Sequence, residues 1–358
     1  VPALDGFCAT DPAYRQRVLD SSVAAQQPLA WPELGPLLPL ADASSVRQAS
    51  ASFTWGTCTG VDLHPRQLAH TSDRALGCLS MLFGMCELAH AIPPQVALTM
   101  FFTRPKPSGG RRIVANLPSF YRVYTETRLD QVREWDARLD RDCFYAGEGK
   151  GSEDAVFDAK LADTIAAHLG RNSVGALGDI RKCFELICHA LLLVEGVAVG
   201  FPARILGVAL AMYQAPRCVL VGDAASAAVV TNSGVAAGCK LATFLVRAFL
   251  LRSLDYLVGS VLVNTARFWY RLTVYVDDLY LQIMGLSPEG TGRHAITVVQ
   301  DMFSVLEGRL GLTFASDKLF LVASTEPALK VAATGLAPLG FVALDSVKLL
   351  GIDHTAGR

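Results

Sequence analysis

Two adjacent carboxylates, Asp277 and Asp278, have the residue type and placing that suit chemistry. They lie between two runs of alternating apolar residues within 272–285, which predicts a β-hairpin with acid at its tip. A third carboxylate, Asp179, ends a mostly apolar run at 174–180. Mg²⁺ is commonly held by one or two carboxylates together with substrate phosphates. Three aspartates at two strand ends therefore indicate nucleotidyl transfer, although an Asp-Asp pair alone is also typical of a plain turn.

The elements that must position these aspartates follow from the spacing of apolar residues. The run at 174–180 predicts a buried strand, followed by a helix with Phe184, Ile187, Leu191 and Val194 on one face. Further patterns predict helices at 75–91, 202–214 and 292–310, a strand at 319–323, and a hairpin formed by 95–103 and 112–116. We expect Met81 and Met85 of the first helix to fill the core.

The sequence blocks that contain the aspartates resemble those of reverse transcriptases, most closely the retroelement branch of non-LTR retrotransposons and group II introns. The blocks are Y-V-D-D at 275–278, D-I-R-K-C-F-E-L-I-C-H at 179–189, G-V-A-A-G-C-K-L-A-T at 234–243, L-G-L-T-F-A-S-D-K at 310–318, L-L-G-I at 349–352 and R-P-K-P-S-G-G-R-R-I-V at 104–114. Each block is short, but their number and order make the resemblance specific.

This resemblance implies an α+β fold with a polymerase palm and fingers. The palm would be a ferredoxin-like βαββαβ antiparallel sheet with helices on one face, and the thumb would be short or absent. The implied domains are an N-terminal extension of unknown role at 1–75, fingers at 76–173 and a palm at 174–358. The palm would hold the acidic strand 174–180, the glycine block 233–243, the Y-V-D-D hairpin 272–285, and two later blocks at 310–323 and 348–352.

The resemblance also implies the catalytic and metal-binding residues of an RNA-directed DNA polymerase. Asp179, Asp277, Asp278 and the backbone of Ile180 would hold two Mg²⁺ ions, for which Mn²⁺ could substitute. Lys318 would protonate the pyrophosphate leaving group as a general acid.

Substrate contacts are implied at positions that match the family's motifs. The nucleotide-binding residues would be Lys106, Arg111, Phe184 and Gly238, and the ring of Phe184 would exclude a ribose 2′-OH. Template or primer contacts would come from Gly234, Tyr275, Leu350 and Gly351. The implied partners are an RNA template, a DNA or RNA primer and dNTPs. Relatives often have a histidine where His189 stands, and we expect a neutral imidazole that bonds a nearby loop.

Two alternatives remain open at this point. An RNA-dependent RNA polymerase shares the palm and its acids, but Y-V-D-D and Phe184 argue against it. A catalytically inactive, nucleic-acid-binding relic is favoured by Ala236 and Ala237, which replace the Pro-Gln usual in that block. The three retained aspartates argue against this relic.

Composition limits the other classes. The 358 residues include 32 Lys and Arg against 33 Asp and Glu, so the net charge of −1 gives no overall attraction to nucleic acid. Positive charge is concentrated locally at Arg104, Lys106, Arg111, Arg112, Arg122 and Arg128. Nine cysteines without a C-x-x-C pair predict neither a zinc site nor a disulfide framework, which suits the nucleus or cytoplasm and not secretion.

Membrane and targeting signals are not found in the sequence. We expect no membrane-spanning helix, because charged residues interrupt every long apolar stretch. The chain starts at Val1 without an initiator Met or a signal peptide, so we expect a fragment of something longer, whose protein partners the sequence does not reveal.

Overall fold

The chain forms two compact units, each from two separate stretches of sequence. The computed structural model describes residues 29, 31, 37–58, 62–105, 109, 111–147, 149–221 and 224–356. The first unit consists of Val1–Trp135 with Phe184–Phe249, and the second of Asp136–Cys183 with Leu250–Arg358. The predicted fingers and palm are contiguous segments, whereas these units are interleaved in sequence. The assignment of fingers and palm to particular residues therefore stays a prediction.

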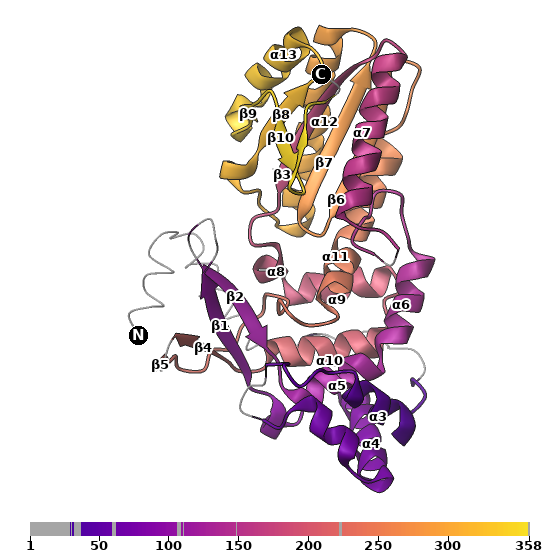
Figure 1. Cartoon of the computed structure of the whole chain (residues 1–358), viewed down its shortest axis with the longest axis vertical. Helices are drawn as coiled ribbons and strands as arrows, with labels where there is room; N and C mark the ends of the chain where they lie inside the picture. Colours follow the sequence, from indigo (N-terminus) through magenta and orange to yellow (C-terminus); the bar gives the residue numbers. More distant parts are fainter. Residues whose placement is uncertain are drawn as a thin grey trace. The chain divides into compact units, whose positions relative to one another are not determined.

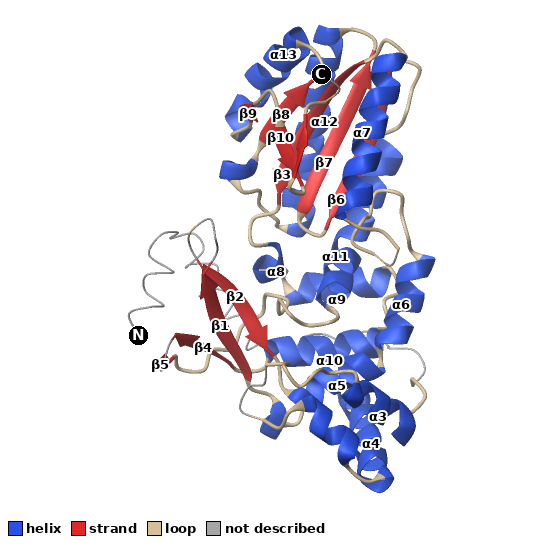
Figure 2. Cartoon of the chain, in the orientation of Figure 1, coloured by secondary structure: helices blue, strands red, loops and turns tan. Residues whose placement is uncertain are grey.

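A five-stranded sheet forms the centre of the second unit (Figures 1 and 2). Its spatial order is β6-β7-β3-β8-β9. The strands are β3 (Asn172–Asp179), β6 (Phe268–Tyr275), β7 (Asp278–Gly285), β8 (Phe320–Ala323) and β9 (Val342–Ala343). The first four are antiparallel to their neighbours, and β9 runs parallel to β8. With α12 (Pro288–Leu310) between β7 and β8, this is the ferredoxin-like order of a polymerase palm, so the predicted fold class is confirmed.

Both faces of this sheet are covered. On one face Gly178 packs against Phe314, which stacks on Phe303 of α12, and α13 (Glu326–Leu336) lies beside α12. Successive strand residues point to opposite faces, so Leu177 and Tyr280 belong to the other face. There they pack against α7 (Ser152–His168) and the hairpin of β10 (Val347–Leu349) and β11 (Ile352–His354). The expected helices thus share one face, and α7 adds a helix to the other.

The first unit has a four-stranded sheet and a group of helices. The sheet has the order β2-β1-β4-β5, from β1 (Thr99–Pro105), β2 (Arg111–Asn116), β4 (Arg217–Val221) and β5 (Ala224–Ala225). Strands β1 and β2 form the predicted hairpin. The helices are α3 (Ala43–Ala51), α4 (Asp73–Ala89), α5 (Ser119–Thr127), α9 (His189–Ala198) and α10 (Ala203–Gln214). Helices α6 (Leu129–Arg138), α8 (Cys183–Leu186) and α11 (Ala242–Tyr256) cross the unit boundaries.

The remaining elements are short. They are the 3₁₀ turns η1 (Pro65–His70), η2 (Pro94–Val96), η4 (Ser316–Lys318) and η5 (Ala337–Leu339), and one π turn, η3 (Leu257–Val261). None of the helices within the described ranges combines the length and the apolar content that crossing a bilayer requires.

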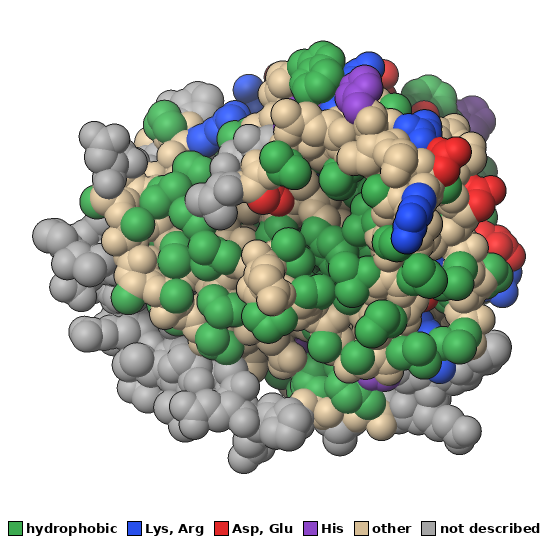
Figure 3. Space-filling model, turned by 90° about the horizontal axis from the view of Figure 1, so that it is seen from below, with side chains coloured by type: hydrophobic (Ala, Val, Ile, Leu, Met, Phe, Trp, Pro, Cys, Tyr) green, Lys and Arg blue, Asp and Glu red, His purple; other side chains and the backbone are tan. Residues whose placement is uncertain are grey.

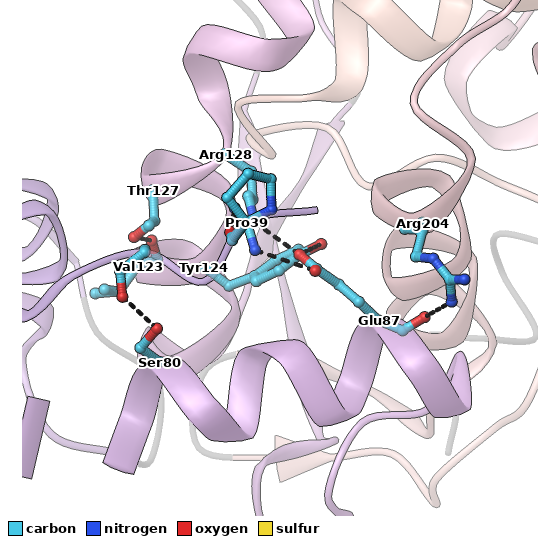
Figure 4. Close-up of polar contacts among 9 residues, drawn as sticks. Pro39, Ser80, Glu87, Val123, Tyr124, Thr127, Arg128 and Arg204 are labelled. Atoms are coloured by element: carbon cyan, nitrogen blue, oxygen red, sulfur yellow. Dashed lines mark hydrogen bonds and ion pairs between the residues drawn. The ribbon is translucent and has the colours of Figure 1, made fainter. Parts of the chain in front are cut away.

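A buried ion pair fastens the helices of the first unit (Figure 4). The Arg128 guanidinium donates to both Glu87 carboxylate oxygens at 2.7 and 3.0 Å, and the two side chains are 3% and 1% exposed. Tyr124 donates its hydroxyl to Glu87, and Arg128 also donates to the Pro39 carbonyl. Because breaking such a pair would leave a buried charge without compensation, it fixes α4 to the α5–α6 corner. The positive charge of Arg128 is therefore paired inside the first unit.

Two local predictions about helices were wrong. Met81 and Met85 are 54% and 62% exposed and do not fill the core. Figure 3 views the chain from below, the side on which α4 lies in Figure 1, and hydrophobic side chains gather on the face that it shows. The single helix expected after Asp179 is two helices, α8 and α9, because Cys188 is extended and forms a β-bridge to Ser233.

Candidate active site

Three aspartates lie at one end of the second unit's sheet. Asp179 is the last residue of β3 and Asp278 the first of β7, and these neighbouring antiparallel strands pair the two residues directly. Tyr275, the last residue of β6, lies opposite Asp278 on its other side. Strand register therefore brings together carboxylates that are far apart in sequence.

The turn between β6 and β7 holds the third aspartate. Its loop has two residues, Val276 and Asp277, and Val276 has a φ of 59°. A positive φ at the first loop position suits a type II′ hairpin turn, but a β-branched residue there costs on the order of 1–3 kcal/mol. The Asp277 carbonyl accepts a hydrogen bond from the Ile180 N–H at 2.9 Å, which fixes the turn against the end of β3.

A second segment brings Lys318 to the aspartates. The Arg181 N–H donates to the Thr313 carbonyl at 2.7 Å, and the Ala315 N–H donates to the Asp179 carbonyl at 2.9 Å. The chain then enters η4, which ends at Lys318. The Lys318 ammonium lies 2.7 Å from Asp179 Oδ1.

The charges in this cluster shift one another's pKa values. Burial, together with the charges of Asp277 and Asp179, raises the pKa of Asp278 to about 6. Burial lowers the pKa of Lys318, but its bond to Asp179 and the nearby charge of Asp278 outweigh this and raise it overall. The Lys318 ammonium thus bonds Asp179 and lies in the field of Asp278 and Asp277.

The donor set suits a hard cation that substrate completes. Within the described part of the chain, no three His, Cys, Asp or Glu side chains are grouped as they would be around one ion. Asp179 and Asp278 do touch, since the Asp179 side chain is hydrogen-bonded to Asp278 and contributes to its raised pKa. Two carboxylates in contact match a Mg²⁺ site in which phosphates supply further oxygens. A cation bound here would place positive charge beside these two carboxylates.

The block at 349–352 forms a tight hairpin. Leu350 and Gly351 are the two loop residues between β10 and β11, with φ values of 49° and 88°. Two positive φ values are typical of a type I′ turn. Leu349 packs with Leu177 and Tyr280 in the core beneath this hairpin.

A buried polar network anchors the same hairpin, and sequence reasoning missed it. His354 Nε2 lies 2.9 Å from Asp163 Oδ2, both side chains being 1% exposed, and 2.7 Å from the Tyr280 hydroxyl. The contact with Asp163 is close but is not an aligned hydrogen bond. Ser173 donates its hydroxyl to the other Asp163 oxygen at 2.7 Å. The only sequence signal was an Asp placed on the apolar face of α7.

The glycine block of the first unit is held by His189. Gly234 has a φ of 93°, and its carbonyl accepts a hydrogen bond from His189 Nε2 at 2.9 Å. Burial, with a further effect from Arg217, lowers the pKa of His189 to about 3. The imidazole is therefore neutral and bonds a nearby loop, as predicted.

Backbone contacts hold the second half of this block against β2. Gly238 has a φ of 104°, and a side chain there would crowd the Ala115 carbonyl at 3.2 Å. The Ala237 carbonyl accepts a hydrogen bond from the Ala115 N–H at 3.0 Å. Because this contact uses only main-chain atoms, it does not require the family's usual Pro-Gln at Ala236 and Ala237.

A cavity of about 420 Å³ lies beside Gly238 in the first unit. Its polar lining includes Asn116, Arg104 of β1 and Arg122 of α5, and Phe102 and Val114 are among its apolar residues. Arg122 also donates to the Cys58 carbonyl at 2.7 Å. The cavity thus combines two cations with apolar surface, which suits a stacked base joined to phosphate.

The other predicted nucleotide contacts belong to the first unit. Lys106 lies outside the described residues. Arg111 begins β2, and its side chain is also outside them. Phe184, in α8, opens the second stretch of the first unit and is half-buried.

Lys240 is engaged within its own unit. Its ammonium forms an ion pair with Glu126 and lies 4.9 Å from the centre of the Phe53 ring.

Comparison with known proteins identifies the fold. No protein-family model and no curated protein matches the sequence. Among solved structures, apo telomerase from Candida tropicalis, truncated from its C-terminal domain, superposes with a TM-score of 0.52 at 12% identity, over 84% of this chain and 62% of that one. Telomerase from Candida albicans, in complex with a TWJ fragment of telomeric RNA, gives 0.50 at 13%, over 77% and 48%. The chain thus spans under two thirds of either neighbour and has a reverse-transcriptase-like polymerase fold.

Proposed function

We propose that this chain is the palm and fingers of a retroelement RNA-directed DNA polymerase, which adds dNTPs to a primer 3′-OH on an RNA template. The observation that carries the proposal is the strand register that pairs Asp179 with Asp278, beside the turn that holds Asp277. The polymerase fold and the ordered sequence blocks support the same reaction. The choice of the retroelement branch depends on those blocks.

The aspartates would hold two Mg²⁺ or Mn²⁺ ions, with the Ile180 backbone beside them. Such ions stabilise the attacking and leaving oxygens of an in-line displacement. The chain's own contribution is to fix the carboxylates: Asp179 and Asp278 by register, and Asp277 through its carbonyl bond to Ile180. The raised pKa of Asp278 favours its protonated form, and this proton would be released when the cations bind.

Lys318 has a separate role in the proposal. Its raised pKa keeps the ammonium protonated at neutral pH, so it can donate a proton to the departing pyrophosphate. Its 2.7 Å bond to Asp179 holds it beside the reacting groups before substrate arrives.

Substrate recognition would use residues outside the aspartate cluster. Lys106 and Arg111 would neutralise the triphosphate, Phe184 would pack beneath a deoxyribose, and the cavity beside Gly238 would take a template base. Gly234, Tyr275, Leu350 and Gly351 would contact template or primer.

Primer extension by the purified chain tests this function. The template is RNA, the substrates are dNTPs or NTPs with Mg²⁺, and the comparison is with the Asp277→Asn, Asp278→Asn double variant. Glu307→Gln, an exposed carboxylate on α12, is the matched control. Extension with dNTPs alone, lost only in the double variant, is the expected result.

Other outcomes separate the alternatives. Incorporation of NTPs would favour an RNA-dependent RNA polymerase. Salt-sensitive RNA binding without extension would favour a non-catalytic relic. A Phe184→Ala variant that gains NTP use would support steric selection by this ring. The choice of template tests the retroelement assignment. Copying of a long heteropolymeric RNA would support it, whereas repeated copying of a short internal stretch would contradict it.

A further inference from the structure

Helix α7 carries an unpartnered apolar stripe on its outer face. Phe157, Leu161, Ile165 and Leu169 follow one another at intervals of four residues and are 66%, 44%, 46% and 53% exposed. The opposite side of α7 packs on the sheet through Val156 and Ala159 (Figure 1). The stripe therefore belongs to no core of the second unit, and large exposed apolar patches mark interaction sites.

Polar side chains lie at both ends of this face, at equal sequence distances from Leu161. Asp154 precedes Leu161 by seven residues and His168 follows it by seven, so both share its side of the helix. Both side chains are exposed. Glu153 adds a second carboxylate to the first turn, and His168 is the basic side chain of the last turn. The face thus has carboxylates at one end and an imidazole, which can donate a hydrogen bond to a carboxylate, at the other.

Such a face is complementary to itself when reversed. In an antiparallel pair of α7 helices with Leu161 on the two-fold axis, Phe157 of each copy meets Ile165 of the other. The same register places each Asp154 opposite the second copy's His168. The helix dipoles are then antiparallel as well, so each acidic N-terminal turn lies near a C-terminal end.

We propose that α7 is a homodimer interface, formed by antiparallel packing of this stripe against a second copy of the chain. The contact is isologous and therefore closed, so it stops at two copies. A single helix pair is expected to bury less than the ~800 Å² per partner of a standard interface, so we expect weak association that depends on protein concentration, with a Kd on the order of 10 µM.

Sedimentation at increasing protein concentration tests the proposal on the full chain. The chain should pass from monomer to dimer, and Leu161→Glu should stay monomeric because it places two carboxylates together on the axis. Met85→Glu changes a more exposed apolar residue on α4 and should dimerise like the parent. Circular dichroism checks that each variant folds. A chain that stays monomeric into the hundred-micromolar range would overturn the proposal, as would a dimer indifferent to Leu161→Glu.

Two further variants fix the geometry. Under mild oxidation Leu161→Cys should cross-link to its own copy, with the cross-linked peptides mapping to residue 161, whereas the parent, with its exposed Cys58 and Cys78, shows the background. Asp154→Lys should weaken dimerisation about tenfold, and adding His168→Glu should restore it. A cross-link that maps elsewhere, or a swap without recovery, would exclude this register and with it the proposed interface.

Discussion

Two polar clusters lie along the same face of β3 and β7 and differ in how far they reach solvent. At one end Asp179 and Asp278 meet with Asp277 nearby, and Lys318 supplies positive charge. Further along, Ser173 of β3 and Tyr280 of β7 join Asp163 of α7 and His354 of β11. Both clusters contain aspartate and use side chains of the same two strands.

Their exposure separates them. Asp163 and His354 are 1% exposed, and Asp163 Oδ1 accepts a hydrogen bond from Ser173. Asp179 is 15% and Lys318 53% exposed, and burial, together with the charges of Asp277 and Asp179, raises the pKa of Asp278. A polar cluster sealed from water stabilises the fold, whereas one that reaches solvent can bind a ligand. The predictions below test this contrast.

The largest effect on activity should come from the cluster of Asp179, Asp277 and Asp278. Asp277→Asn or Asp278→Asn should reduce primer extension by at least about 10³-fold, because each removes a charge that would bind the cations. Quenched-flow extension assays measure the loss. Asp163→Asn should keep most of its activity at a temperature where it is folded, and equal losses would remove the proposed distinction.

The unfolding free energy should depend more on the buried cluster around Asp163 and His354. Asp163→Asn removes the buried carboxylate beside His354 and should cost about 3 kcal/mol of the unfolding free energy. Tyr280→Phe removes one hydrogen bond and should cost about 1 kcal/mol. Urea unfolding, followed by a probe placed in the second unit, checks both. Glu153→Gln on the exposed side of α7 is the control and should leave the midpoint unchanged.

Lys318 should affect rate more than binding. Lys318→Ala should lower kcat about 100-fold with a smaller change in KM, because the loss falls on proton donation to the leaving group. The same assay across pH should show the basic limb of the parent profile disappear in the variant. A loss confined to KM would instead indicate a phosphate contact.

The smallest effect concerns Asp278 without metal. A carboxyl with a raised pKa in the folded state binds more protons when folded, so this residue's contribution falls as pH rises from about 4 through about 6. Asp278→Asn should match the parent at pH 4 and exceed its unfolding free energy by about 1 kcal/mol at pH 7, after allowance for solvent screening. Added Mg²⁺ should narrow the gap. A variant less stable at pH 7 would show that Asp278 is structural.

The strands and turns around the aspartates could be predicted because their signals are local. Alternating apolar residues on both sides of Asp277 and Asp278 indicate the hairpin, and the structure places it as β6 and β7. The ordered blocks then indicated the ferredoxin-like palm, which is confirmed.

The features that were missed depend on distant partners. His354 meets Asp163 only after the β10–β11 hairpin folds onto α7, and no spacing in either segment indicates that contact. The break between α8 and α9 arises where Cys188 pairs with Ser233, far along the chain. Met81 and Met85 fit the periodicity of a buried helix, but burial depends on what packs against each side of α4.

The absence of a side chain at Gly175 limits how this sequence can have changed over time. A Cβ at Gly175 would overlap the ring and hydroxyl of Tyr280, the residue that bonds His354. Alanine at 175 is therefore accessible only after residue 280 has become smaller, so the two changes must occur in a fixed order. Ancestral reconstructions of such palms should recover glycine at this position wherever tyrosine stands opposite, and Gly175→Ala should be tolerated only together with Tyr280→Leu.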